Sequence, residues 1–183
     1  MADILNAAYQ AEVAFRKRDF VSDDNTINGI YRLASFLTSE NSKFGLMFSG
    51  ICGNGKTTLL LAFQNMLNLL TESGYLNGVG ISIVDAKDVA GYAKDIQKFE
   101  LLKRKEMLAI EDMGREPVEV FEYGNVLNPV IDLLEYRYNA QLFTIITTNL
   151  VPKDIRERYG VRLADRFNEM FEKIIFWNET YRK

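Results

Sequence analysis

The segment GICGNGKT at positions 50–57 is the feature that most constrains the fold of this chain. It matches the pattern G-x-x-x-x-G-K-T in full. Glycine is needed where the backbone must wrap around a phosphate group with no Cβ in the way. The freed amides and the start of a following helix then face the anion with partial positive charge. The segment therefore predicts a strand, a phosphate-binding loop and a helix, in that order.

The residues on either side of this loop fit that prediction. A short apolar run over 45–50 precedes it, and an apolar-rich helix is expected over 56–70. In such a loop the Lys56 ammonium reaches the β- and γ-phosphate oxygens, and the Thr57 hydroxyl ligates Mg²⁺. The residues expected to bind the nucleotide are Gly50, Cys52, Gly53, Asn54, Gly55, Lys56, Thr57 and Thr58.

Apolar runs that predict strands recur along the whole chain. They lie at 45–50, 79–86, 107–112, 142–149 and 173–177. Helical patterns separate them, over 88–105, 123–138 and 163–172. Strands that are apolar on both faces and alternate with helices are typical of a parallel sheet covered on both sides. The sequence therefore predicts a three-layer α/β domain.

Two further helices are expected before the first strand. Ile4, Leu5, Ala8, Ala11 and Phe15 have near-helical spacing in the lead-in over 1–20, and the domain proper is expected over 21–183. Asp23-Asp24-Asn25-Thr26 is a favourable N-cap cluster, and it is followed by the stripe Ile30, Leu33, Ala34 and Leu37. The lead-in helix either docks a partner or packs on its own core. We favour the core, because an apolar stripe at helical spacing usually faces one.

Composition excludes several chemistries. The chain has no histidine, which rules out imidazole bases, Ser-His-Asp sites and His-ligated metals. Its single cysteine allows no internal disulfide and fits a reducing cytoplasm. The net charge of −3 disfavours tight stand-alone DNA binding. No apolar stretch is long enough for a membrane span, and the N-terminus lacks a secretory pattern, so we expect a cytoplasmic protein.

Polar residues follow two of the expected strands. Glu111 and Asp112 end the run at 107–112, and such a carboxylate pair can hold Mg²⁺ and polarise an attacking water. Asn149 ends the next run, and its amide could hydrogen-bond the γ-phosphate or the lytic water. Ligands of open α/β sheets bind at the carboxyl ends of strands, which favours a functional role for all three residues.

Two other groups of basic residues are less specific. Arg162 and Arg166 share one face of a helix, a pattern that on its own favours a solvated surface. The segment 87–105 contains Tyr92 and Phe99 among basic residues, which is a single-strand-binding pattern, although a solvated amphipathic helix is about as plausible. Its basic residues are Lys87, Lys94, Lys98, Lys103, Arg104 and Lys105.

Taken together, the segments GICGNGKTTL, AIEDMG, YGNVLNPVIDLLEYRYNAQLFTIITTNL and YGVRLADRFNEM resemble the AAA+ ATPases of the DnaC/IstB class. That class contains bacterial replicative-helicase loaders and transposition helper ATPases, and the resemblance covers roughly residues 20–180. It implies an AAA+ core with a five-stranded parallel sheet of order 5-1-4-3-2. It also implies Mg²⁺-dependent ATP hydrolysis, and helicase loading on single-stranded DNA in DNA replication.

The resemblance assigns roles residue by residue. The loop Gly50–Thr57 is the Walker A motif, Glu111 and Asp112 are the Walker B pair, and Asn149 is the sensor-1 residue. Arg166 is at the arginine-finger position, with Arg162 as the alternative. The catalytic set is therefore Lys56, Glu111, Asp112, Asn149, Arg166 and Arg162, and the metal ligands are Thr57, Glu111 and Asp112.

The sequence departs from the class in ways that carry further expectations. The usual acidic pair begins with Asp, whereas this chain has Glu111, whose extra methylene displaces the metal-facing carboxylate and predicts slow hydrolysis. No helical lid domain is expected after the fifth strand. A site open on that side would be closed by a neighbouring copy, so we expect ATP-dependent head-to-tail rings or spirals.

Other functions are compatible with the same residues. One is an IstB-like transposition helper, and another is a nucleotide sensor that does not hydrolyse ATP, suggested by the Glu111-Asp112 order. A third is a small-molecule phosphotransferase. It is disfavoured because no Arg-rich lid segment lies between the third and fourth strands. The nucleotide is expected to be ATP, because the guanine-specific N-K-x-D motif is lacking.

Overall fold

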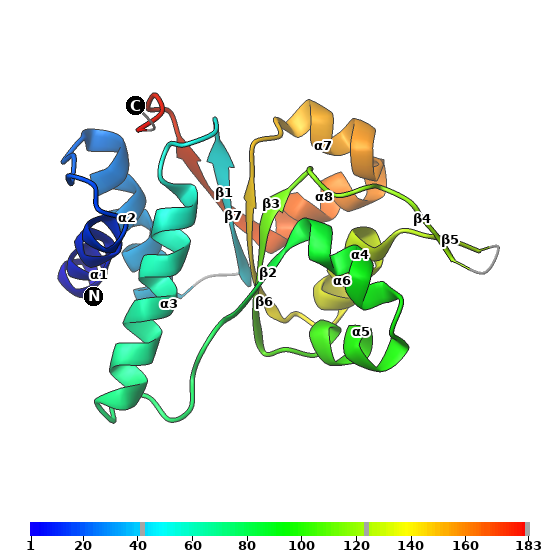
Figure 1. Ribbon diagram of the computed structural model, residues 1–183, viewed down its shortest axis with the longest axis horizontal. Coiled ribbons are helices and arrows are strands. Elements are labelled where there is room, and N and C mark those ends of the chain that lie inside the picture. Colours follow the sequence, from blue (N-terminus) through cyan, green and yellow to red (C-terminus); the bar gives the residue numbers. More distant parts are fainter. Residues whose placement is uncertain (41–42, 123–124, 182–183) are drawn as a thin grey trace. The chain divides into compact units, whose positions relative to one another are not determined.

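The computed structural model describes residues 1–40, 43–122 and 125–181 (Figure 1). Its internal contacts form two compact units. Unit 1 comprises Met1–Ser42, Gly50–Ile81 and Ile174–Lys183, and unit 2 comprises Lys43–Ser49 and Ser82–Lys173. Among the helices of these described residues, none is long and apolar enough to cross a lipid bilayer.

Unit 1 contains the first three helices, α1 (Ala2–Phe15), α2 (Asp24–Thr38) and α3 (Lys56–Glu72). Helix α1 packs against both α2 and α3. Helix α2 begins as predicted, because the Asp23 carboxylate accepts a hydrogen bond of 2.8 Å from the Thr26 amide. The interior of this unit is built from apolar side chains of the three helices, among them Leu5, Ile30, Leu33, Leu59, Leu60 and Phe63.

The predicted apolar stripe of α1 was partly wrong. Helix α1 buries Leu5, Ala8, Tyr9 and Glu12, whereas Ile4 and Phe15 are 43% and 83% exposed. Glu12 lies on the buried face because its carboxylate is paired with Arg16 at 2.8 Å and accepts a hydrogen bond from Asn65 of α3 at 3.3 Å. An apolar pattern alone cannot predict a buried, satisfied carboxylate.

The sheet has the strand order β2-β3-β6-β1-β7. Its strands are β1 (Gly45–Gly50), β2 (Ser82–Asp85), β3 (Met107–Met113), β6 (Phe143–Thr148) and β7 (Phe171–Phe176). Strand β1 pairs in parallel with β6, β6 with β3, and β3 with β2. When these five strands are numbered 1 to 5 along the chain and the sheet is read from the β7 edge, the order is the expected 5-1-4-3-2. The strand labels differ from that numbering because an unpredicted hairpin precedes the fourth sheet strand.

Among the described residues of unit 2, five helices accompany the sheet. They are α4 (Ala86–Ala93), α5 (Ile96–Lys103), α6 (Pro129–Asn139), α7 (Pro152–Tyr159) and α8 (Val161–Met170). One hydrophobic cluster joins them to the strands, with Val89, Phe99, Leu133, Ile155 and Phe167 from the helices and Met47, Leu108, Ile110 and Ile146 from the sheet. The single helix expected over 88–105 is two short helices, interrupted between Ala93 and Ile96.

The helix expected over 123–138 begins only at Pro129. Positions 123–124 lie outside the described residues. The flanking residues form an antiparallel hairpin of β4 (Val120–Glu122) and β5 (Asn125–Leu127), which leads into α6 (Figure 1). Proline favours the first turn of a helix, because its missing N–H would have no partner there. The strand expected over 79–86 is likewise shorter, because β2 covers only Ser82–Asp85.

Candidate functional site

The phosphate loop of unit 1 connects the end of β1 to the start of α3. Three of its glycines have left-handed backbone angles, with φ of +144° at Gly50, +82° at Gly53 and +100° at Gly55. A Cβ at Gly50 would lie 2.4 Å from the Phe176 carbonyl oxygen. Asn54 donates a 3.0 Å hydrogen bond to that same carbonyl. Glycine is therefore required by the close approach of the chain as well as by the turn.

The Lys56 side chain is folded under the loop. Only 5% of the residue is exposed, and its ammonium donates hydrogen bonds of 2.7 Å to the carbonyls of Gly50 and Ile51. A third bond of 3.1 Å reaches Asn54 Oδ1. These bonds hold the loop in a curl around one fixed positive charge.

The start of α3 adds to this charge. The helix begins at Lys56 and has Gly55 as its N-cap, with no capping side chain. The first backbone N–H groups of a helix have no acceptor within the helix itself, and the helix dipole is positive at this end. Glycine-lined backbone, a fixed ammonium and an uncapped helix start form a donor set that fits a phosphate group. Thr57 and Thr58 are half-buried in the first turn, and the Cys52 thiol is exposed.

The segment 178–181 is hydrogen-bonded to the phosphate loop. The Tyr181 amide donates a 2.9 Å hydrogen bond to the Gly53 carbonyl, and Asn178 donates one of 3.4 Å to the Asn54 carbonyl. The Tyr181 hydroxyl contacts Asp23 and Thr26 at the start of α2. Burial, followed by the hydrogen bond to Asp23, raises the pKa of Tyr181 to about 12. No sequence motif marks these residues, so none of them was predicted.

Glu111 and Asp112 lie where β3 ends in unit 2. The register with β6 shifts between Ile110 and Met113, and Asp112 has a left-handed φ of +54°. The Asp112 amide donates a 2.9 Å hydrogen bond to Thr147 Oγ1 of β6, and its carboxylate pairs with Arg115 at 2.5 Å. A non-glycine residue in this backbone region is uncommon and is often found at functional sites.

Asn149 follows β6 at the same edge of the sheet. Met113 is paired with Thr148, the last residue of β6, so Asn149 follows β6 next to the end of β3 that carries the carboxylate pair. Asn149 is exposed, whereas Thr147 and Thr148 are fully buried. Two half-buried carboxylates and an exposed amide offer the oxygen ligands that Mg²⁺ prefers.

Arg162 and Arg166 of α8 share one partner, the Glu135 carboxylate of α6. Arg166 donates to it at 2.7 Å, stacks at 4.8 Å from the Tyr138 ring, and has a side chain that is only 16% exposed. Arg162 approaches the same carboxylate at 3.4 Å and is 76% exposed. Of these two arginines, Arg162 is therefore the one that is accessible to a neighbouring molecule.

The basic segment of α4 and α5 differs from its predicted pattern. Phe99 is 9% exposed and belongs to the hydrophobic cluster, so it presents no ring for base stacking; Tyr92 is 38% exposed. Lys98 pairs with Asp95, and both Lys103 and Arg104 pair with Glu100. The interleaved aromatic pattern is therefore reduced to one exposed tyrosine.

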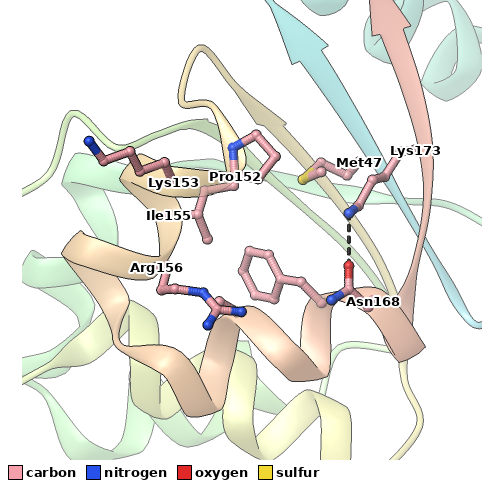
Figure 2. A pocket seen from close by; sticks show the side chains of 9 residues that line it. Met47, Pro152, Lys153, Ile155, Arg156, Asn168 and Lys173 are labelled. Atoms are coloured by element: carbon pink, nitrogen blue, oxygen red, sulfur yellow. Dashed lines mark hydrogen bonds between the residues drawn. The ribbon is translucent and has the colours of Figure 1, made fainter.

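A cavity of about 310 Å³ lies in unit 2 between α7, α8 and the sheet (Figure 2). Apolar side chains of Met47, Ile155 and Phe167 line it together with Lys153, Arg156 and Lys173, and Lys173 donates a 2.8 Å hydrogen bond to Asn168. None of the predicted site residues lines this cavity.

Within the described part of the chain, no three Asp, Glu or Cys side chains lie close enough together to hold a metal ion.

The sequence matches no family model and no curated protein. Its fold, however, is similar to that of several solved structures. A crystal structure of the DnaC helicase loader is 23% identical with a TM-score of 0.66, over 86% of this chain and 93% of that one. A crystal structure of DnaI is 22% identical with a TM-score of 0.64, over 100% of this chain and 94% of that one.

A replication initiator, DnaA, bound to AMPPCP and single-stranded DNA, is 18% identical with a TM-score of 0.60, over 85% of this chain and 48% of that one. The expected α/β fold with a five-stranded sheet is thus confirmed, as is the resemblance to DnaC at the level of fold.

Proposed function

We propose that this chain is an ATP-binding, slowly hydrolysing AAA+ ATPase that acts in DNA replication as a DnaC-like helicase loader. It would bind single-stranded DNA and a replicative helicase in the cytoplasm, and form a ring or spiral when ATP is bound. The observation that carries the proposal is the phosphate loop, in which Lys56 is held by the carbonyls of Gly50 and Ile51.

In this proposal, different residues bind the phosphates, activate the attacking water and hold the metal ion. The loop amides and Lys56 bind and orient the phosphates. Asp112 is the candidate to orient and deprotonate the attacking water, and Asn149 the candidate to hydrogen-bond it. Thr57, Glu111 and Asp112 would hold Mg²⁺, which when bound neutralises phosphate charge. We infer slow turnover because Glu111 is one methylene longer than the usual aspartate, and a shift of about 1 Å can cost on the order of a hundredfold in rate.

Two of the solved structures similar to this chain support the replication role. One is a helicase loader, and the match covers nearly its whole length; the other, DnaA, was solved with AMPPCP and single-stranded DNA. Binding of both ligands to this chain is proposed from that likeness in fold together with the loop geometry. The domain division at residues 1–20 and 21–183, and each of the catalytic assignments, stay predictions.

The test is nucleotide turnover measured against protein concentration, with ATP or GTP, and with or without single-stranded DNA. We expect turnover that is selective for ATP, needs Mg²⁺ and rises more steeply than protein concentration, because a neighbour completes the site. Stimulation by the DNA would support a loader. Glu111→Asp should raise the rate, and Asp112→Asn should abolish it while ATP remains bound.

Turnover that is linear in protein and indifferent to DNA would contradict the proposal. A second candidate, a nucleotide sensor without hydrolysis, is favoured by one observation, the 2.5 Å pairing of Asp112 with Arg115. ATP binding without turnover in wild type, combined with turnover in Arg115→Ala, would support that alternative. Binding of a transposase in place of a helicase would support the transposition-helper function.

A further inference from the structure

The turn that follows β3 is strained and tightly packed. Asp112 and Gly114 both have left-handed φ angles, +54° and +110°. The Arg115 amide closes the turn with a 3.2 Å hydrogen bond to the Asp112 carbonyl. A Cβ at Gly114 would lie 2.8 Å from the Leu150 side chain. Glycine adopts a positive φ readily, but a non-glycine residue such as Asp112 keeps a left-handed φ only where its surroundings hold it.

Strand β6 holds one side of this turn. Thr147 Oγ1 accepts the Asp112 amide at 2.9 Å, and Thr148 Oγ1 donates to the Met113 carbonyl at 2.7 Å. Both threonines are fully buried. These contacts fix the backbone at Asp112 and Met113 but do not reach Gly114.

Glu116 holds the other side. Its side chain is 1% exposed, and one carboxyl oxygen accepts the Gly114 amide at 2.8 Å. The other oxygen accepts the Tyr159 hydroxyl of α7. Arg158 of α7 donates to the Glu116 backbone carbonyl, and its Nε lies 3.8 Å from the carboxyl group. Both carboxyl oxygens thus have donors, as a buried acidic group requires.

Tyr159 keeps its proton in this arrangement. Burial, followed by the hydrogen bond to Glu116, raises the pKa of its hydroxyl above the ordinary range. The hydroxyl therefore remains a donor at neutral pH. Glu116 links the turn to α7 by accepting from the Gly114 N–H on one side and by contacting Tyr159 and Arg158 on the other.

We propose that Glu116 is a positioning residue for Asp112: it holds the Gly114 amide and so fixes the turn from which the Asp112 carboxylate projects. This inference rests on the proposed ATPase function, in which Asp112 orients the attacking water. We infer that Glu116 acts through the backbone, because its carboxyl oxygens accept hydrogen bonds from Gly114 and Tyr159 and also pair with Arg158 at 3.8 Å.

According to this proposal, a side chain at position 116 must be able to accept a hydrogen bond from the Gly114 amide. In Glu116→Gln the amide oxygen can still accept from Gly114, and the NH₂ group can donate to the Tyr159 oxygen. In Glu116→Ala the Gly114 amide has no acceptor. Glu119→Ala is the matched control, because Glu119 is a nearby exposed glutamate.

The experiment is steady-state ATP turnover of the full chain, with ATP affinity measured separately by equilibrium binding and folding checked by the melting temperature. For Glu116→Ala we expect kcat to fall about a hundredfold, the cost of a displacement of about 1 Å, with KM within about threefold of wild type. Glu116→Gln should recover kcat to within about threefold of wild type, and Glu119→Ala should have no effect.

Tyr159→Phe keeps the experiment decisive if the alanine variant does not fold. It removes one donor to Glu116 and retains the packed ring, so we expect a fall in kcat with unchanged ATP affinity. Hydrogen exchange at the Gly114 amide supplies a readout that needs no turnover, and should be faster in Tyr159→Phe and in Glu116→Ala.

The outcomes separate this inference from the proposed function. Wild-type protein without ATP turnover would contradict the proposed function, while faster Gly114 exchange in the variants would still support the anchoring of the turn. Normal kcat in Glu116→Ala and Tyr159→Phe, beside an inactive Asp112→Asn, would overturn the positioning role alone. A parallel fall in kcat, ATP affinity and melting temperature that Gln does not recover would overturn it as well, because a general loss of structure would explain all three.

Discussion

At the scale of single residues, the most unusual group is the Arg137 guanidinium of α6, which is completely buried. It donates hydrogen bonds to the carbonyls of Lys103, Lys105 and Phe143 and to the Thr144 hydroxyl, at 2.6 to 3.0 Å. Burial lowers the pKa of Arg137 to about 10, so the group is still charged at neutral pH. Its planar guanidinium group satisfies four acceptors from two segments of unit 2, 103–105 and 143–144, at once.

Arg137→Met should therefore destabilise the protein by about 3 kcal/mol, because several buried acceptors lose their donor. Arg137→Lys should also destabilise it, because a single ammonium cannot reach all of these acceptors. The measurement is urea unfolding followed by circular dichroism. Arg104→Met is the matched control, since Arg104 is 67% exposed and should contribute little. An Arg137→Lys variant as stable as wild type would contradict the idea that the several donors of the guanidinium group are needed.

At the scale of elements, α1 packs on α2 and α3 within unit 1, which favours a core role over a docking role for its buried face. Leu5 is completely buried, whereas Phe15 of the same helix is 83% exposed. Leu5→Ala should cost about 2 to 4 kcal/mol of unfolding free energy, and Phe15→Ala should cost little. Chemical denaturation measures both. Equal and small effects would mean that α1 contributes little to the stability of unit 1 and is available for docking.

The sequence predicted the elements whose patterns are local. The five sheet strands are continuous apolar runs, and α2 has an N-cap aspartate, so both could be placed within a few residues. The hairpin β4–β5 was missed because its strands are only three residues each and carry no turn motif within the described residues. Helix α7 was missed because it buries only Ile155 and Tyr159 among charged residues. Short elements owe their conformation to tertiary contacts, which local patterns do not contain.

At the scale of the whole molecule, the candidate site was predictable where a contiguous motif encodes it. The glycines and Lys56 of the loop act as one local unit, so their geometry follows from their order in the sequence. Glu116 and Tyr159 meet across 43 residues, and the contact of Tyr181 with Thr26 spans 155. Such contacts depend on how the sheet and helices assemble, and no spacing rule predicts them.

Residues that would act between two copies of the chain are equally hard to predict from the sequence. Arg166, the position implied by resemblance, is engaged by Glu135 and Tyr138, whereas Arg162 is exposed. If the site is completed by a neighbouring copy, the structure favours Arg162 as the arginine that reaches it. Head-to-tail contact would then place one intact arginine beside each phosphate loop of the assembly.

Complementation between two inactive variants tests this arrangement. Arg162→Ala lacks the arginine and keeps its own site, and Asp112→Asn binds ATP but lacks the carboxylate. In a random 1:1 mixture, about a quarter of head-to-tail contacts join an intact site to an intact arginine, so about a quarter of wild-type turnover should return. Neither variant alone, nor a mixture of Asp112→Asn with the double variant, should show turnover. Arg166→Ala in place of Arg162→Ala decides between the two arginines, and a mixture that stays inactive in both cases would mean that neither arginine acts across the contact.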